Sequence, residues 1–581
     1  MKTHLNVAIG QYSHRGRKQL NQDCHGSSVP AEPQLSTKGI ALAIADGISS
    51  SDVSQVASQT SVKSFLEDYY CTSETWSVKT SAERVLQANN SWLYAQNHRN
   101  HEFRLNKDKG YVCTFSTLIF KSNTAYLFHV GDAQISRLGI SETRDKTEVL
   151  TQQHRLWLSG DRSYLARALG IVQPLEIDYA ELPLAYGDVF FLATDGVYEY
   201  VSEEFVSQTI TANFNDLDLA AKNIAEHALG QGSEDNLTVQ IARIEALPSG
   251  QSNEFLQRQN ELPFPPELTA RMTFDGYQVL RDLHKSSRSH VLLARDLLTQ
   301  QKVVIKVPST EGRHDRSYVE RFLLEDWIAN RLNNAHIVKS HKASAKRRYC
   351  YVVSEFVDGQ TLAQWMVDNP TPSLDEVRSI VEQVAIGLQA FHRQEMLHQD
   401  LRPENIMIDV SGTAKIIDFG SAFVSGIEET RTSEMSQVMP GTAQFLAPEY
   451  FLGEFGSKQS DIYSLACIAY HMLSGRSPYG ASVARALNRS AQHRLVYQSV
   501  LAAHRPLPAW VDLTLKKALQ PDRFKRYSEL SEFIQDLRKP NIKFIAQARP
   551  PLLERDPLVF WKGVSLIFGV VIIGLLYLNF N

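Results

Sequence analysis

The feature that most constrains this 581-residue chain is a pair of short motifs in its second half. The first, HQDLRPENIMID, covers residues 398–409, and the second, KIIDFG, covers residues 415–420. In this spacing Asp400 can accept the proton of a substrate hydroxyl, while Asn405 and Asp418 offer hard oxygens to Mg²⁺ ions that bridge nucleotide phosphates. A chance match to both motifs in this order is very rare. Together they indicate phosphoryl transfer.

A strand that carries a lysine and a helix that carries a glutamate are predicted upstream of these motifs. KVVIKV at residues 302–307 is a β-branched run with Lys306 in its middle, and residues 316–332 form a helical stretch that carries Glu325. An ion pair between the two side chains can hold the Lys306 ammonium against nucleotide phosphates. Taken alone, Lys306 is better explained as a surface lysine on an edge strand, so its role depends on the later motifs.

Further motifs follow in a fixed order. They are SEFVDG (354–359), GTAQFLAPEY (441–450), DIYSLACIAYHMLSGRSPY (461–479) and PDRFKRY (521–527). With these motifs, residues 277–538 resemble the eukaryotic-type (Hanks-type) protein Ser/Thr kinases. The resemblance implies a bilobal fold that binds ATP with Mg²⁺ and phosphorylates Ser or Thr of proteins.

The resemblance also implies roles for single residues. The implied catalytic residues are Asp400, Asn405, Lys306 and Glu325. The implied nucleotide-binding residues are Lys306, Ser286, Ser289, Glu355, Val357, Asn405 and Asp418, of which Asn405 and Asp418 would also bind Mg²⁺. Asp461 would brace the catalytic loop, and Arg526 would pair with Glu449.

Two departures from the family pattern keep a pseudokinase open as an alternative. Ser286 and Ser289 stand where the loop over the phosphates usually has glycine, which leaves the backbone less freedom at positive φ. Gln399 stands before Asp400, where an arginine usually answers a phosphate on the activation loop. Activity is therefore expected not to depend on phosphorylation of that loop.

In the N-terminal part of the chain, acidic residues flank apolar, strand-like runs. They are Asp46 in ALAIADG, Asp132 in HVGD, Asp195 in FFLATDG and Asp235 in GSEDNLTV. Singly, each fits an ordinary turn, because Asp-Gly and Asp-Asn are common turn pairs. Together they can converge at one edge of a sheet, where carboxylates suit Mg²⁺ or Mn²⁺. Two such ions can activate water for attack on phosphorus, and His154 is a candidate to protonate the leaving group.

These residues belong to an ordered series of motifs. The series is SHRGRKQLNQDCHG (13–26), AIADGISSSDVSQVAS (43–58), CTFSTLIF (113–120), HVGDAQ (129–134), LARALG (165–170), ATDGVYEYVS (193–202) and GSEDNLTVQIA (232–242). Over residues 7–244 the chain thus resembles the metal-dependent protein Ser/Thr phosphatases of type 2C. The resemblance implies a central β-sandwich flanked by helices, with a dimetal centre.

This second resemblance also assigns residues. Asp46 would bridge both metals, Gly47 would offer its carbonyl, Asp195 and Asp235 would bind the first metal, Asp132 a looser third one, and Asp23 a metal-bound water. Arg17 or Lys18 would contact phosphate. Gln22 replaces the glutamate usual in the family, so weaker metal binding is expected. A degenerate domain that only binds or regulates remains an alternative.

The rest of the chain connects and ends these two parts. Residues 245–276 are predicted to be a linker and residues 539–557 a juxtamembrane segment. Residues 558–578 carry one charge, Lys562, and at about 1.5 Å per residue match a hydrocarbon core about 30 Å thick. They predict a single transmembrane helix, with a buried core helix as the alternative. Basic residues precede it, which predicts cytoplasmic catalytic domains. By resemblance, the short-linked arrangement of two such domains is bacterial in character, which implies the inner membrane.

The sequence as a whole predicts a multidomain α+β protein with opposing activities. Sixty Lys and Arg against 64 Asp and Glu leave a net charge of −4, which argues against a nucleic-acid partner. The predicted function is bifunctional: ATP-dependent phosphorylation of protein Ser/Thr and metal-dependent hydrolysis of protein phospho-Ser/Thr. Self-phosphorylation is expected at Thr430, Thr432, Ser433 or Ser436. The alternative is a membrane-tethered kinase or scaffold with one inactive domain.

Overall fold

The protein divides into two compact units. The first comprises Met1–Glu261 with Val424–Ser436, and the second Leu262–Phe423 with Gln437–Asn581. The computed structural model describes residues 4–139, 146–157, 163–248, 263–286, 289–309, 316–341, 347–428, 444–503, 507–542, 544 and 557–580. The predicted linker and juxtamembrane segment lie partly outside these residues, and the predicted phosphorylation sites Thr430–Ser436 lie wholly outside them.

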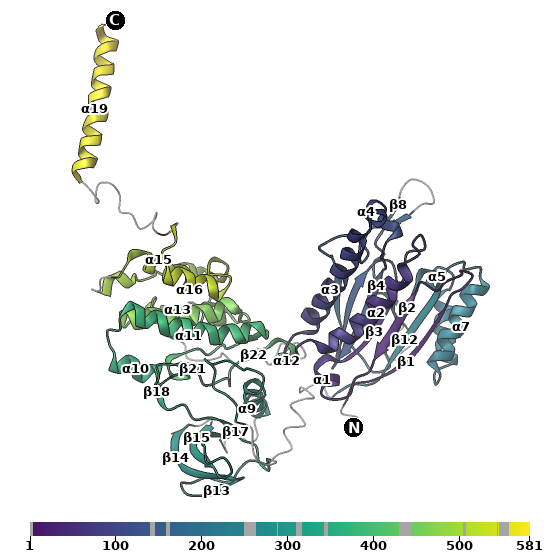
Figure 1. Cartoon of the computed structure of the whole chain (residues 1–581), viewed down its shortest axis with the longest axis horizontal. Coiled ribbons are helices and arrows are strands. Elements are labelled where there is room, and N and C mark those ends of the chain that lie inside the picture. Colours follow the sequence, from purple (N-terminus) through teal and green to yellow (C-terminus); the bar gives the residue numbers. More distant parts are fainter. Residues whose placement is uncertain are drawn as a thin grey trace. The chain divides into compact units, whose positions relative to one another are not determined.

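Two antiparallel sheets form the centre of the first unit (Figure 1). One sheet has the order β1 (Asn6–His14), β12 (Leu237–Ala246), β11 (Val189–Ala193), β6 (Gln134–Leu138) and β7 (Glu148–Val149). The other has the order β10 (Asp178–Pro183), β5 (Thr124–Val130), β4 (Phe115–Lys121), β3 (Ile40–Ala45) and β2 (Cys24–Ser28).

Strand β3 shows why the sheets stack. Its sequence IALAIA is buried throughout, and successive side chains point to opposite faces. The large residues Ile40, Leu42 and Ile44 join the core that contains β11 and β12 residues. The small alanines between them leave room for helices α2 (Ser54–Cys71) and α3 (Val78–Arg99) to pack closely.

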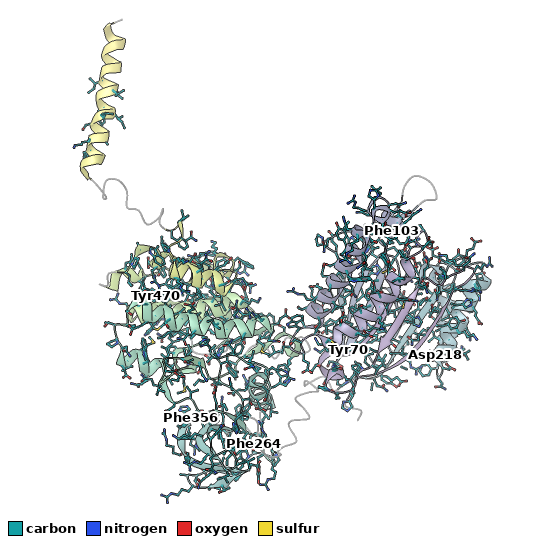
Figure 2. All side chains as sticks on the ribbon, in the orientation of Figure 1. Tyr70, Phe103, Asp218, Phe264, Phe356 and Tyr470 are labelled. Carbon is teal, nitrogen blue, oxygen red and sulfur yellow. The ribbon has the colours of Figure 1, made fainter. Side chains whose placement is uncertain are left out.

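The other sheet has helices on its outer face. Residues of α6 (Glu203–Ala212) and α7 (Leu217–Gly230) share a core with β11 and β12. Asp218 of α7, labelled in Figure 2, accepts a hydrogen bond from the Gln11 amide of β1 at 2.8 Å. Figure 1 shows α2 and α3 on one side of the sheets and α7 on the other. The predicted β-sandwich flanked by helices is confirmed.

Short elements connect these layers. They are α1 (Gln34–Lys38), α4 (His101–Leu105), η1 (Lys107–Lys109), β8 (Arg155–Trp157), β9 (Ser163–Leu165), α5 (Asp195–Tyr198) and, from the distant segment, α12 (Ser425–Glu428). The acidic residues singled out above lie where strands end. Asp46 follows β3, and Asp132 lies between β5 and β6. Asp195 follows β11, and Asp235 precedes β12.

The second unit begins with strands and continues with helices. Its first sheet has the order β13 (Thr273–Phe274), β14 (Tyr277–Lys285), β15 (Ser289–Asp296), β16 (Lys302–Pro308) and β17 (Val352–Glu355). Helix α9 (Arg316–Ala329) follows β16. The helical part contains α10 (Leu362–Asp368), α11 (Leu374–Arg393), α13 (Lys458–Ser474), α14 (Arg489–His493), α15 (Ala509–Ala518) and α16 (Leu530–Arg538). The predicted bilobal fold is confirmed.

Small strands and turns complete the second unit. They are β18 (Gly359–Thr361), β19 (Met396–Leu397), β20 (Ile406–Asp409), β21 (Ala414–Ile416), β22 (Phe423–Val424), η3 (Pro403–Asn405), η5 (Pro448–Leu452), η6 (Gly480–Arg485), η7 (Val500–Ala503) and η8 (Arg523–Lys525). Helix α11 starts at a capping box in which Ser373 and Glu376 bond each other's backbone amides. Helix α13 is buried along almost its whole length. Its Tyr470, labelled in Figure 2, donates to Gln498 O at 2.8 Å.

The segment predicted to span a membrane lies within α19 (Pro557–Phe580), so its helical character is confirmed. The side chains that the structure describes on it, residues 561–572, include exposed Trp561, Leu566 and Val570. Across the part of the chain that the structure describes, no helix combines the length and hydropathy that a membrane crossing needs. The predicted transmembrane span is therefore not supported.

Candidate active sites

In the second unit, Lys306 of β16 joins two acidic residues. Its Nζ lies 2.7 Å from Oε2 of Glu325 on α9 and 3.2 Å from Oδ1 of Asp418. Burial raises the pKa of the Glu325 carboxyl to about 7, although Lys306 favours its ionised form. Burial also disfavours the charged Lys306, but Glu325 and Asp418 outweigh it, so the pKa of the ammonium is raised. The predicted lysine–glutamate pair is therefore formed, with the ammonium charged at neutral pH.

The catalytic loop is organised by hydrogen bonds around Asp400 and Asp461. Asn405 Nδ2 donates to the Asp400 carbonyl at 2.8 Å and to its carboxylate at 3.2 Å. The buried carboxylate of Asp461 accepts from the amides of His398 and Gln399 at 3.0 and 3.1 Å and from His392 Nε2 at 2.9 Å. Asp461 thus holds this loop, as predicted.

Gln399 has an uncommon backbone conformation for a residue with a side chain, with φ at +63°. The consecutive amides of His398 and Gln399 both donate to the Asp461 carboxylate, and these two bonds compensate for such local strain. The residue that replaces the expected arginine therefore serves the loop through its backbone. The carboxyl of Asp461 itself is buried, which disfavours ionisation, but the bond from His392 outweighs this and keeps its pKa low.

In the loop expected to cover nucleotide phosphates, Ser286 and Ser289 form hydrogen bonds with each other. Ser286 N–H donates to Ser289 O at 2.9 Å, and Ser289 N–H donates back to Ser286 Oγ at 3.1 Å. In the predicted hinge, the Glu355 carboxylate accepts from Lys415 Nζ at 2.7 Å and from the Lys339 amide at 3.0 Å. The Glu355 side chain is thus engaged within the protein, while Val357 is buried.

The helical part of the second unit contains a buried ion pair between Arg526 and Glu449. Arg526 donates through Nη1 and Nη2 to the two carboxylate oxygens of Glu449 at 2.8 and 2.7 Å. Ser460 Oγ adds a bond to Glu449 at 2.6 Å. Burial disfavours the charged Glu449, but the hydrogen bonds and charge of Arg526 lower its pKa below the usual value. The pairing predicted from PDRFKRY is present.

In the first unit the acidic residues come together, with two cations among them. Arg155 Nε lies 2.8 Å from Asp132 Oδ2, its Nη2 lies 2.6 Å from Asp195 Oδ2, and its Nη1 lies 3.1 Å from Glu199 Oε1. Lys18 Nζ binds Asp235 and, at 2.5 Å, Ser49 Oγ. Arg155 was not predicted from sequence. Its position next to His154 in a polar loop was the one available signal.

Asp23 is buried in this cluster, and the neighbouring Asp46 is half-buried. Burial and the charges of Asp23, Asp195 and Asp132 raise the pKa of Asp46 well above its usual value. Burial and Asp132 likewise raise the pKa of Asp195 to about 7. Asp23 Oδ2 accepts from Thr194 and Thr238 at 2.9 and 2.7 Å, whereas its buried Oδ1 has no hydrogen-bond partner among the described residues.

The donor set suits a hard divalent cation, because carboxylates that disfavour each other's ionisation are stabilised by added positive charge. The buried Oδ1 of Asp23 also needs a partner. Within the described residues, however, no group of three His, Cys, Asp or Glu side chains is already arranged to hold a metal. Arg155 and Lys18 supply the positive charge instead, so a metal would have to displace them.

Hydrogen bonds within the protein engage two residues of this unit whose roles were predicted from the sequence. His154 Nδ1 accepts from the Gly131 amide at 3.1 Å, and its Nε2 lies 2.8 Å from Asp178 Oδ2, so its role as a proton donor stays a prediction. Gln22 Nε2 donates to Ser51 O and Ser54 Oγ at 2.8 and 2.7 Å, and the weaker metal binding expected from this residue also stays a prediction. These bonds need an amide donor, which a glutamate lacks.

The remaining predicted residues are placed as follows. Gly47 is buried, and an added Cβ there would lie 2.8 Å from Ser54 O, so only glycine fits. Arg17 is exposed, whereas Lys18 reaches the acidic cluster. Lys18 is therefore the better-placed candidate for a phosphate contact. The metal-binding and phosphate-binding roles of all these residues stay predictions.

Comparison with known proteins agrees with both halves of this picture. Residues 277–541 match the protein kinase domain family, and residues 10–231 match the protein phosphatase 2C family. The chain contains a protein kinase domain and a protein phosphatase 2C domain. The kinase domain carries the Lys306–Glu325 pair and the Asp400 loop, and the phosphatase domain carries the carboxylates around Arg155.

Curated relatives match the kinase domain. The serine/threonine-protein kinase PrkC of Bacillus subtilis is 28% identical over 263 residues, covering 45% of this chain and 40% of the relative. The probable serine/threonine-protein kinase PknB of Bifidobacterium longum is 32% identical over 271 residues, covering 45% of this chain and 39% of the relative. The chain therefore spans less than half the length of these relatives.

Solved structures match the phosphatase domain. The catalytic domain of the serine/threonine protein phosphatase PstP, in complex with two manganese ions, is 21% identical to this chain. The match covers 42% of this chain and 100% of that one, with a TM-score of 0.34.

Proposed function

We propose that this protein is a bifunctional signalling enzyme that phosphorylates Ser and Thr of proteins and hydrolyses phospho-Ser and phospho-Thr. The observation that carries the proposal is Lys306 Nζ, which lies within 3.2 Å of both Glu325 and Asp418. This three-residue arrangement is what a protein kinase needs to position nucleotide phosphates. It supports an active kinase over a pseudokinase.

In the proposed kinase reaction the protein positions two reactants and moves one proton. Lys306 orients the phosphates of ATP, and Asn405 and Asp418 would hold Mg²⁺. Asp400 accepts the proton of the Ser or Thr hydroxyl while the hydroxyl oxygen bonds to the γ-phosphorus, and the bond from that phosphorus to ADP, the leaving group, breaks. Asn405 orients Asp400 through the 3.2 Å bond to its carboxylate, and Asp461 keeps the loop in place.

In the proposed phosphatase reaction, Asp46, Asp195, Asp235 and the Gly47 carbonyl would hold Mg²⁺ or Mn²⁺. When bound, these ions lower the pKa of water and stabilise charge on the phosphoryl group. Lys18, once released from Asp235, is placed to bind the phosphate of the substrate. Thr194 and Thr238 fix the carboxylate of Asp23 by donating to its Oδ2.

The two activities are separable by mutation in the full chain. We would incubate wild type, Asp400→Asn and Asp46→Asn with ATP, Mg²⁺ and Mn²⁺ and map phosphosites by mass spectrometry. Asp400→Asn should leave all sites empty, and Asp46→Asn should keep phosphate that wild type loses. An aryl phosphate assay checks hydrolysis separately. Phosphate incorporation by Asp400→Asn at the wild-type rate would contradict the kinase half of the proposal.

We also propose that the chain modifies itself at Thr430, Thr432, Ser433 or Ser436, because a tether raises the local concentration of substrate to roughly millimolar. Occupancy of these sites should rise in Asp46→Asn over wild type and vanish in Asp400→Asn. Equal occupancy in wild type and Asp46→Asn would mean that the phosphatase domain acts on other substrates.

A membrane location is a further proposal, supported by the exposed apolar side chains of α19, such as Leu566, Phe568 and Val570. Deleting residues 558–581 should move the protein from the membrane fraction to the soluble fraction with both activities kept. A truncated chain that still pellets with membranes, or a full chain that never does, would contradict it.

A further inference from the structure

A short segment that follows the Asp418-Phe419-Gly420 motif in sequence packs within the first unit. Residues Val424–Ser436 belong to that unit, together with Met1–Glu261. The described part of the segment forms α12 (Ser425–Glu428), in which Gly426 is buried and Ile427 is 4% exposed. A helix this short has little stability of its own, so its surroundings must hold it.

Lys121 provides the first contact to this segment. It is the last residue of β4, and only 1% of its surface is exposed. Its Nζ donates to the Gly426 carbonyl at 2.6 Å. A buried ammonium is costly unless it is bonded, and this hydrogen bond helps to satisfy it. The segment from the distant part of the chain supplies the acceptor of this bond.

The loop between α2 and α3, residues 72–77, provides the second contact. The Gly426 amide donates to the Thr75 carbonyl at 2.9 Å, so both backbone groups of Gly426 are bonded to this surface. The approach is close enough to require glycine. A Cβ at position 426 would lie 2.7 Å from Trp76 O and 3.0 Å from Glu74 O. The fit is therefore specific for this residue type.

We propose that the surface made by Lys121 and residues 72–77 is a docking site for the chain's own segment Val424–Glu428. In this arrangement the phosphatase domain holds the start of the kinase activation segment. Gln399 offers no cation that could bind a phosphorylated loop, so the segment needs another anchor. Lys121 and Thr75 provide it through the backbone of Gly426, without any phosphate.

Hydrogen–deuterium exchange of the full-length chain tests the docking directly. Gly426→Ala should speed exchange of the peptide covering residues 423–427 at least tenfold, because the added Cβ meets three carbonyl oxygens. Gly230→Ala is the matched control, since nothing lies within 4 Å of a Cβ there. Lys121→Met should act like Gly426→Ala, with exposed Lys63→Met as its control.

Exchange in β11 (Val189–Ala193) reports whether the sandwich stays folded. If Lys121→Met unfolds the sandwich, the comparison of Gly426→Ala with wild type is the test of the docking site, because Gly426 lies outside the sandwich. Unchanged exchange at residues 423–427 in Gly426→Ala would overturn the docking site, and so would an equal change in Gly230→Ala.

The consequence for catalysis rests on the proposed kinase activity and has its own readout. Gly426→Ala should lower the initial rate of autophosphorylation at least fivefold without changing hydrolysis of an aryl phosphate. A higher rate would show that docking restrains the kinase, which would overturn the anchoring role. Hydrogen–deuterium exchange does not require catalysis. If the proposed kinase activity is disproved, the docking site can therefore still be tested.

Discussion

Arg155 binds Asp195 through a bond of 2.6 Å between Nη2 and Oδ2. The same guanidinium reaches Asp132, which lies between β5 and β6, and Glu199, which follows α5 directly, so one positive charge is shared among three carboxylates. A tethered guanidinium in this position competes with a divalent cation for the same oxygens. The phosphatase domain thus carries its own counter-ion, and the proposed metal ions would have to exchange with it.

Removing this counter-ion should favour metal binding. Arg155→Gln is expected to tighten Mn²⁺ binding about tenfold, which corresponds to about 1.4 kcal/mol. Isothermal titration of metal-depleted protein measures it without turnover. The melting temperature in EDTA should fall at the same time, since the carboxylates lose their partner. Arg167→Gln, which removes a more exposed arginine, serves as the control. Equal Mn²⁺ affinities in wild type and Arg155→Gln would show that the guanidinium does not compete.

Restoring the glutamate usual in the family at position 22 should not help the metal site. Gln22→Glu replaces a donor to Ser51 O and Ser54 Oγ with a buried carboxylate, so we expect a loss of about 1–3 kcal/mol in the free energy of unfolding. Urea denaturation measures this loss. An unchanged stability, combined with a lower Mn²⁺ demand, would show that residue 22 faces the metals after all.

Lys306 and Asp400 should each be needed for catalysis, and Asp400 should not be needed for folding. Lys306→Met and Asp400→Asn are each expected to lower the autophosphorylation rate at least about 100-fold, because phosphate positioning or the proton acceptor is lost. Thermal unfolding should be nearly unchanged in Asp400→Asn. Only Lys306→Met should also weaken ATP binding, measured by fluorescence of a nucleotide analogue. Equal nucleotide affinity in both variants would argue against the role of Lys306.

The buried pair of Glu449 and Arg526 should dominate the acid sensitivity of the kinase domain. Arg526→Met leaves a buried carboxylate without its partner, with an expected cost of about 3–5 kcal/mol. Because the pKa of Glu449 is lowered in the folded state, its contribution is complete above its ordinary value of 4.5 and is lost as pH falls through the lower folded value. Between pH 3 and 6 the free energy of unfolding, measured by urea denaturation, should therefore fall more steeply with decreasing pH in wild type than in Glu449→Gln.

His129 should make the phosphatase domain less stable in mild acid. Burial lowers its pKa from 6.5 to about 4, so its contribution is complete above pH 6.5 and is lost as pH falls toward 4. The shift corresponds to about 3 kcal/mol. His129 accepts from or donates to Ser116 at 2.7 Å and lies 3.0 Å from Gln152 O, contacts that His129→Gln can partly keep. That variant should flatten the stability profile between pH 4 and 6.5. A profile as steep as in wild type would assign the effect to other groups.

Much of the architecture was predictable because it depends on residue patterns within single elements and on the order of motifs along the chain. The alternation in IALAIA determines which face of β3 meets the other sheet and which meets α2 and α3. The spacing of Asp400, Asn405 and Asp418 likewise predicts a nucleotide site, since Asp400 and Asn405 share one short loop and Asp418 follows the next strand pair, β20 and β21. The order of motifs also separates the two domains.

The tertiary structure decided what each polar group actually meets. His154 and Gln22 looked available for catalysis or metal binding, yet both are bonded to groups far along the chain or across a turn. Arg155 carried no sequence signal for its three carboxylate partners, because they come from elements brought together only by the sandwich. Lys121 and Gly426 lie 305 positions apart, and only folding joins them. Sequence determines which groups are present and their local geometry, whereas long-range packing determines which charges and backbone groups satisfy one another.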